Sequence, residues 1–198
     1  MDDDLARILF AAIWLPFAAM RIYYIRLGGA EMRPVYSRWE GRGFAFVRVF
    51  LALPWMAFLL VWLVRPSTAS WASFALAAPW RWLGAGLLAA GALLVFWVNR
   101  TLGRNFSGSL ALRSDHRLVQ EGPYRRVRHP MYPGFLAMTV GMLLLSANWM
   151  IGVPPILGVL YVMAVRTPRE EAMLIDRFGD EYRRYRERTG RFVPRISA

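Results

Sequence analysis

The stretch PMYPGFLAMTVGMLLLSANWMIGVPPILGVLYVMAV, residues 130–165, decides the fold, because none of its 36 residues carries a charge. One helix of that length would reach about 54 Å, far beyond the roughly 30 Å hydrocarbon core of a bilayer. Ser146 and Asn148 interrupt the run near its middle. Split there, the run predicts two helices of about 17 residues each, which form a tight hairpin across a membrane.

Upstream of this hairpin the chain has three more apolar stretches of spanning length, residues 5–25, 44–64 and 82–98. Hydrophobic residues make up 57% of the whole chain, more than in a soluble domain. The sequence therefore predicts an all-α integral membrane protein with five transmembrane helices. Residues 66–81 are apolar but short, and we expect them to lie along the outer interface.

Charge alternates along the chain in a way that orients these helices. All 25 basic residues are Arg, and the formal net charge is +12. Residues 21–48 carry six Arg against two Glu, residues 100–129 seven Arg against two acids, and residues 166–198 nine Arg against six acids. Cytoplasmic segments attract positive charge, so we expect the N-terminus outside and the C-terminus in the cytoplasm, in a cytoplasmic (inner) membrane. Since the basic residues fall between apolar stretches, we expect no nucleic-acid partner.

Cysteine is absent and histidine is rare, which excludes several kinds of site. Without Cys the chain has no disulfide, no Cys-ligated zinc or iron–sulfur centre and no thiol nucleophile. The two His, His116 and His129, leave little for a transition-metal site, so we expect no metal.

Beyond the hairpin, residues 168–188 have the spacing of an amphipathic helix. One apolar stripe recurs every three to four residues through Ala172, Ile175, Phe178, Tyr182 and Tyr185. Thr167 is placed to cap the helix and Gly190 follows its expected end. We therefore predict a cytoplasmic tail helix that begins after the last span.

Three Gly residues inside the third span, Gly84, Gly86 and Gly91, imitate part of a dinucleotide-binding fingerprint. No strand precedes them and they lie in an apolar helix, so we interpret them as positions where helices pack closely.

Residues 116–134 hold both His, three Pro and two Tyr, and run directly into the fourth span. Pro residues prevent a regular helix there, so an ordered loop at the membrane face is expected. Such a loop can present backbone groups to a ligand, but a basic interfacial loop bound to anionic lipid headgroups has the same composition.

The segment Arg166-Thr-Pro-Arg-Glu-Glu171 lies where the fifth span leaves the membrane. Here too two interpretations stand. Arg166 either reaches the interface as a snorkelling residue or fixes an anionic substrate, and Glu170 either caps a helix or holds a cationic cofactor.

These two segments stand on either side of the uncharged run and share elements with a known family. The elements are Gly122-Pro123-Tyr124, Arg128-His129-Pro130, Tyr132 and Gly134 before the run, and Arg166, Glu170-Glu171, Phe178-Gly179 and Tyr182 after it. Together they resemble the isoprenylcysteine carboxyl methyltransferase family and the related phospholipid N-methyltransferases, over about residues 99–195.

The resemblance implies S-adenosylmethionine as the methyl donor, bound at the cytoplasmic face. Arg166 would face the acceptor carboxylate, and Glu170 would meet the cationic end of the cofactor. The resemblance further implies a cofactor site formed by His116, Arg117, Leu118, Val119, Tyr124, His129, Pro130, Met131, Tyr132 and Glu170.

From the resemblance we expect methylation of the carboxylate of a lipophilic or lipidated acceptor that enters from the membrane lipids. The alternatives are a phospholipid or small-molecule N- or S-methyltransferase, an NADPH-dependent sterol-type reductase, and a non-enzymatic membrane protein. We assign residues 1–98 to the acceptor side and residues 99–198 to one unit of cofactor loop, hairpin and tail helix. The oligomeric state is not predicted.

Overall fold

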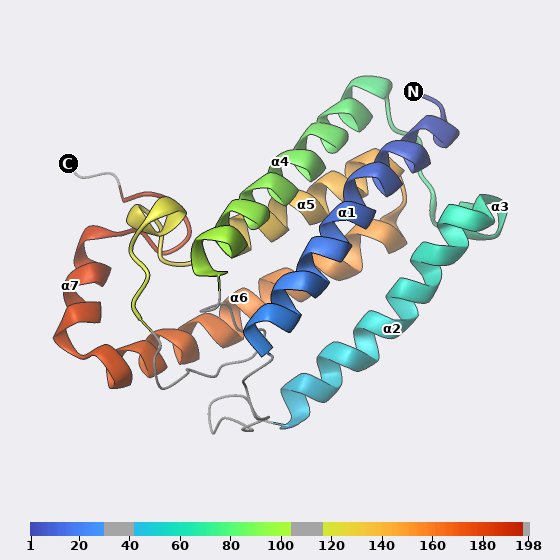
Figure 1. Cartoon of the computed structure of the whole chain (residues 1–198). Coiled ribbons are helices and arrows are strands. Elements are labelled where there is room, and N and C mark those ends of the chain that lie inside the picture. Colours follow the sequence, from blue (N-terminus) through green and yellow to red (C-terminus); the bar gives the residue numbers. More distant parts are fainter. Residues whose placement is uncertain (30–41, 104–116, 196–198) are drawn as a thin grey trace.

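The computed structural model describes residues 1–29, 42–103 and 117–195, and these residues are almost entirely helical. They include two isolated β-bridges and no strand. The long helices, drawn in Figure 1, are α1 (Asp3–Gly29), α2 (Arg42–Val64), α4 (Ala78–Leu102), α5 (Met131–Ser146) and α6 (Trp149–Phe178). Short elements are α3 (Pro66–Ala69), η1 (Ser70–Ala72), η3 (Gly122–Arg125) and α7 (Asp180–Arg188).

Three of the long helices, α1, α4 and α6, are long and apolar enough to cross a bilayer. The helix α5 and the Ala52–Val64 part of α2 are apolar but shorter. Successive helices run in opposite directions, so that the ends of α1, α4 and α6 lie with the start of α5 at one end of the bundle (Figure 1). This arrangement supports a multi-pass integral membrane protein.

The predicted hairpin is confirmed, and its turn has a clear local cause. Ala147 adopts the left-handed conformation with φ 47°, which ends α5 after Ser146. The side chain of Asn148 then caps α6, because its Oδ1 accepts from the backbone N–H groups of Met150 and Ile151 at 3.1 and 3.3 Å. The polar pair that interrupts the uncharged run therefore makes the turn.

Asn148 also joins the hairpin to the segment before α4. Its Nδ2 donates to the Ala69 carbonyl at 3.1 Å and lies 3.3 Å from Ser73 Oγ. In that segment, residues 66–72 form α3 and η1. Residues 78–81, which we assigned to the outer interface, are the first turn of α4 instead, since Pro79 suits a helix start.

Glycines bring α4 and α5 into backbone contact, as predicted for Gly84 and Gly91. A Cβ on Gly91 would lie 2.6 Å from the carbonyl oxygen of Gly134, and a Cβ on Gly84 would overlap the backbone of Leu145. Gly141 of α5 meets the backbone of α4 in the same way. Gly86, by contrast, has nothing within 4 Å of its Cβ position, so the interpretation is wrong for that residue.

The predicted tail helix is wrong in its boundaries. No helix begins at Thr167, because α6 continues through Pro168 to Phe178, with Thr167, Glu171 and Met173 buried along it. The break comes at Gly179, whose φ of 53° only glycine adopts without strain, and α7 follows. This bend changes which face is covered: Tyr182 and Tyr185 are buried as expected, but Ala172 is exposed.

The contact between α4 and α5 yields a prediction. We expect Gly91→Ala to destabilise the protein by about 1–3 kcal/mol, because the added methyl group meets backbone atoms that cannot move aside. Thermal unfolding in detergent measures the effect. Gly86→Ala lies on the same helix in open space and should leave the transition unchanged or raise it slightly. Equal transitions for the two variants would contradict the packing described here.

Candidate functional site

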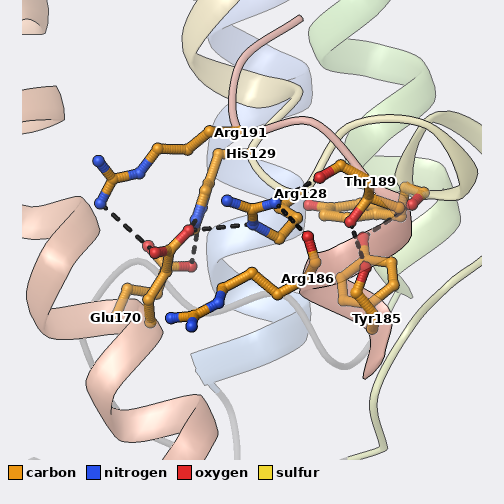
Figure 2. A network of polar contacts seen from close by, with 9 residues as sticks. Arg128, His129, Glu170, Tyr185, Arg186, Thr189 and Arg191 are labelled. Carbon is orange, nitrogen blue, oxygen red and sulfur yellow. Dashed lines mark hydrogen bonds and ion pairs between the residues drawn. The ribbon is translucent and has the colours of Figure 1, made fainter. Parts of the chain in front are cut away.

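Both sequence segments singled out above meet where α5 begins and the last part of α6 passes. Residues 126–130 lead into α5, while Arg166, Glu170 and Glu171 come from α6. The chain after α7 returns to the same place, as Figure 2 shows for Thr189 and Arg191. Three segments that are distant in the sequence therefore surround one cluster of charged side chains.

Glu171 is the centre of this cluster. Its Oε1 accepts from Arg128 Nε at 3.1 Å and lies 3.2 Å from His129 Nε2. Its Oε2 lies 3.4 Å from Arg191 Nη2. Only 11% of the Glu171 side chain is exposed, and the side chain of Arg128 is 10% exposed. A carboxylate with this many partners in a nearly buried place is held in one position.

The segment after α7 pairs with the loop before α5 through the backbone. Arg128 N–H donates to the Gly190 carbonyl at 2.8 Å, and His129 N–H donates to the Arg191 carbonyl at 3.0 Å. In return Gly190 N–H donates to the Arg126 carbonyl at 3.1 Å. Arg128 also donates from its side chain to the carbonyls of Arg186 in α7 and of Thr189 just after it, as drawn in Figure 2. The loop is thus ordered by the C-terminal part of the chain.

Glu170 differs from its neighbour Glu171 because its contacts are long. His129 Nδ1 lies 3.9 Å from Glu170 Oε1, and Arg166 Nε lies 4.0 Å from Glu170 Oε2. Both distances exceed a hydrogen bond, and 30% of the Glu170 side chain is exposed. Glu170 therefore faces the site with hydrogen-bonding capacity to spare, while Glu171 serves the protein itself.

Tyrosines form the wall beside these carboxylates. Tyr185 donates from its hydroxyl to the Tyr124 carbonyl at 2.7 Å, and burial raises the pKa of Tyr185 to about 12. Burial and then the charge of Glu170 raise the pKa of Tyr124 well above its usual value. Both phenols are therefore neutral at physiological pH. Among the described residues, the buried hydroxyls of Tyr182 and Thr167 have no hydrogen-bond partner.

Most of the predicted site residues come together here. Tyr124 is in η3, His129 and Pro130 are buried before α5, and Met131 and Tyr132 form its first turn. The rings of His129 and Tyr132 lie 6.1 Å apart. His116 lies outside the described residues. The described contacts do not join Arg117, Leu118 or Val119 to Glu170; the next residue, Gln120, is hydrogen-bonded to Glu181 of α7 instead.

Sequence reasoning did not single out Arg128 or Arg191 as site residues. Arg128 stands in the Arg-His-Pro element, so that motif was a signal for it. Arg191 gives no signal in the sequence, because it reaches Glu171 only after α7 has turned the chain back. Their common partner explains why both belong to the site.

Comparison with known proteins supports the resemblance. Residues 83–176 match the model of the isoprenylcysteine carboxyl methyltransferase family. Protein-S-isoprenylcysteine O-methyltransferase B of Arabidopsis thaliana is 35% identical over 99 residues, which are 49% of this chain and 50% of that protein. The Schizosaccharomyces pombe enzyme is 35% identical over 48% of this chain and 41% of its own. The chain thus spans half or less of the length of these relatives.

A solved structure extends the similarity to the fold of almost the whole chain. The eukaryotic intramembrane Ras methyltransferase, an isoprenylcysteine carboxyl methyltransferase, aligns with a TM-score of 0.57 at 21% identity. The alignment covers 95% of this chain and 68% of that one. At this identity the similarity concerns the arrangement of helices, which includes the N-terminal helices that carry no recognisable motif.

The position of Glu171 yields a prediction about stability. We expect Glu171→Gln to lower the free energy of unfolding by about 2–5 kcal/mol, because the nearly buried guanidinium of Arg128 would lose its charged partner. Thermal unfolding and proteolysis of the C-terminal segment in detergent measure this loss. Glu187→Gln, exposed on α7, should change stability by less than about 0.5 kcal/mol. A similar small effect at Glu171 would show that it does not organise the site.

Proposed function

We propose that this chain is an integral membrane methyltransferase of the isoprenylcysteine carboxyl methyltransferase family. In this proposal it transfers a methyl group from S-adenosylmethionine to the carboxylate of a lipophilic, isoprenylcysteine-like acceptor. One observation carries the proposal: His129 of the first motif lies between Glu170 and Glu171 of the second. The motifs that suggested the family therefore lie next to each other in the fold, although the uncharged hairpin separates them in the sequence, and this supports the proposal.

The residues of this site fit the cofactor. S-adenosylmethionine supplies, when bound, a methyl group on a positively charged sulfur, so its binding site needs a carboxylate and polar groups rather than a nucleophile. Glu170 offers a partly exposed carboxylate whose nearest partners are beyond hydrogen-bond distance. The unpartnered hydroxyls of Tyr182 and Thr167, noted above for the described residues, add hydrogen-bonding capacity nearby. The tightly held Glu171 keeps His129 in place beside it.

The acceptor end of the reaction is assigned to Arg166. Its side chain is 15% exposed and lies one helical turn before Glu170, so it reaches the same site from the membrane side. An acceptor carboxylate is ionised at neutral pH and needs no general base. Arg166 would hold one of its oxygens and orient the other, and the surrounding helices would exclude water. The scarcity of acids and bases in the chain agrees with chemistry of this kind.

We further propose that all five long helices cross the membrane, with the N-terminus outside. The direction of the helices supports this topology, because the cluster around Glu171 and the Arg-rich α7 then lie at the cytoplasmic end. Asp3 and Asp4 then lie outside. In the same proposal, residues 99–198 bind the cofactor. The N-terminal helices shape the entry of a lipophilic or lipidated acceptor.

Cofactor binding is the first test. We expect S-adenosylhomocysteine to bind the detergent-purified protein by calorimetry, and Glu170→Ala to weaken the affinity at least about tenfold through loss of one charged contact. Glu187→Ala removes an exposed carboxylate from α7 and should leave the affinity unchanged. Folded wild-type protein that binds only NADPH would contradict the proposal and favour a reductase.

The role of Arg166 is tested by turnover. We expect Arg166→Ala to reduce methylation of an S-prenylated cysteine at least about tenfold, because the carboxylate loses its orienting partner. Affinity for S-adenosylhomocysteine should be retained, which separates acceptor binding from cofactor binding. Arg169→Ala, an exposed Arg on the same helix, is the matched control. Wild-type turnover by Arg166→Ala, or methylation of phospholipid amines in place of carboxylates, would contradict the assignment.

A further inference from the structure

Arg21 is a charged residue within the predicted first span, and it contacts the other helices. It lies on α1, and its side chain is half-buried. Arg21 Nη1 donates to Asn99 Oδ1 at 2.9 Å, and Asn99 is fully buried on α4. A charged side chain that points into a membrane helix bundle is costly, and such residues usually serve binding or transport.

The other contacts of Arg21 place it at the beginning of α5, next to the site described above. Its Nη1 lies 4.0 Å from Met131 Sδ, and its guanidinium carbon lies 5.4 Å from the centre of the Phe135 ring. Met131 is the first residue of α5 and follows the Arg-His-Pro element directly. Arg21 therefore lies beside the start of α5, where Met131 follows His129 by two residues.

Arg166 of α6 is also near Arg21. The positive charges of the two residues interact unfavourably, although α1 and α6 are far apart in the sequence. Figure 1 shows the C-terminal end of α1 at the same end of the bundle as the start of α5. Each helix thus brings one guanidinium group to the same end of the bundle.

Two guanidinium groups near each other in a partly buried place make this end of the bundle favourable to an anionic ligand. Repulsion between like charges grows as water is excluded, and a bound anion relieves it. A carboxylate suits the pair especially, because each of its oxygens can accept charge-assisted hydrogen bonds from Arg. The apolar surroundings of Phe135 and Met131 also suit the lipophilic part of such a ligand.

We infer that Arg21 is a second acceptor-binding residue, which together with Arg166 binds the carboxylate of a lipophilic acceptor. This inference rests on the function proposed above and adds a residue from α1 to the site. The two Arg residues together would make the protein selective for an anionic head group over a neutral one of the same shape. This selectivity is a difference in binding affinity, so it can be measured without methyl transfer.

The test compares two ligands that differ only in charge. We would measure calorimetric binding of an S-prenylated cysteine and of its neutral carboxamide to detergent-purified protein, with and without S-adenosylhomocysteine. We expect the wild type to prefer the carboxylate at least about tenfold, since charge-assisted hydrogen bonds contribute that much. Arg21→Gln should lose most of this preference, and Arg21→Lys should keep part of it because the charge remains.

Arg26 provides the matched control, because it is an exposed Arg in the last turn of the same helix. Arg26→Gln should retain the full preference. A thermal transition close to that of the wild type shows that Arg21→Gln is folded; if it is not folded, Arg21→Lys carries the comparison. Equal binding of the two ligands by the wild type, or an unchanged preference in the folded Arg21 variant, would overturn the inference.

Turnover of the same S-prenylated cysteine by the wild type separates this inference from the proposed function. Turnover together with an unchanged preference in Arg21→Gln rejects only the role of Arg21. The wild type could instead prefer the carboxylate through Arg21 and yet not methylate the compound. That result would support the anion site and reject the proposed methyl transfer.

Discussion

The backbones of α4 and α5 lie against each other at glycines, and this contact sets the position of the site. At Gly91 and Gly134 a methyl group would already collide with the opposite helix, so the two helices are as close as their backbones allow. The end of α4 is thereby brought to the start of α5. Asn99, Met131 and the Arg-His-Pro element lie together for this reason, and Arg21 of α1 completes the group.

Glu170 and Glu171 are neighbours on one helix, yet they have different roles. Successive residues of an α-helix point about 100° apart, so the two carboxylates face different partners. Glu171 is used by Arg128, His129 and Arg191 to join the loop before α5 with the segment after α7. Glu170 is thereby positioned next to His129 without being consumed by the same contacts. The carboxylate of Glu171 thus orders the loop, while the carboxylate of Glu170 stays available to a ligand.

Charge is distributed in the bundle in the way that the proposed chemistry requires. A methyl donor with a positive sulfur needs a carboxylate, and an anionic acceptor needs cations on the other side of the reacting atoms. In the proposed function Glu170 would provide the first, and Arg166 and Arg21 would provide the second, at the same end of the bundle. The neutral tyrosines Tyr124 and Tyr185 lie at the site without adding charge, and the Tyr185 hydroxyl donates to the Tyr124 carbonyl.

The sequence by itself determined the helices, the hairpin turn at Ser146–Asn148 and the two motifs, because these depend on local hydrophobicity and on residue types at short spacing. It misplaced the tail helix, since burial of Thr167 and Met173 holds α6 together beyond the point where a cap pattern suggested a new start. Only the tertiary structure decided that Arg128 and Arg191 share Glu171, and that Arg21 reaches α5. Those contacts join residues more than 15 positions apart, and their formation depends on how closely the helices pack and where Gly179 turns the chain, which no local pattern encodes.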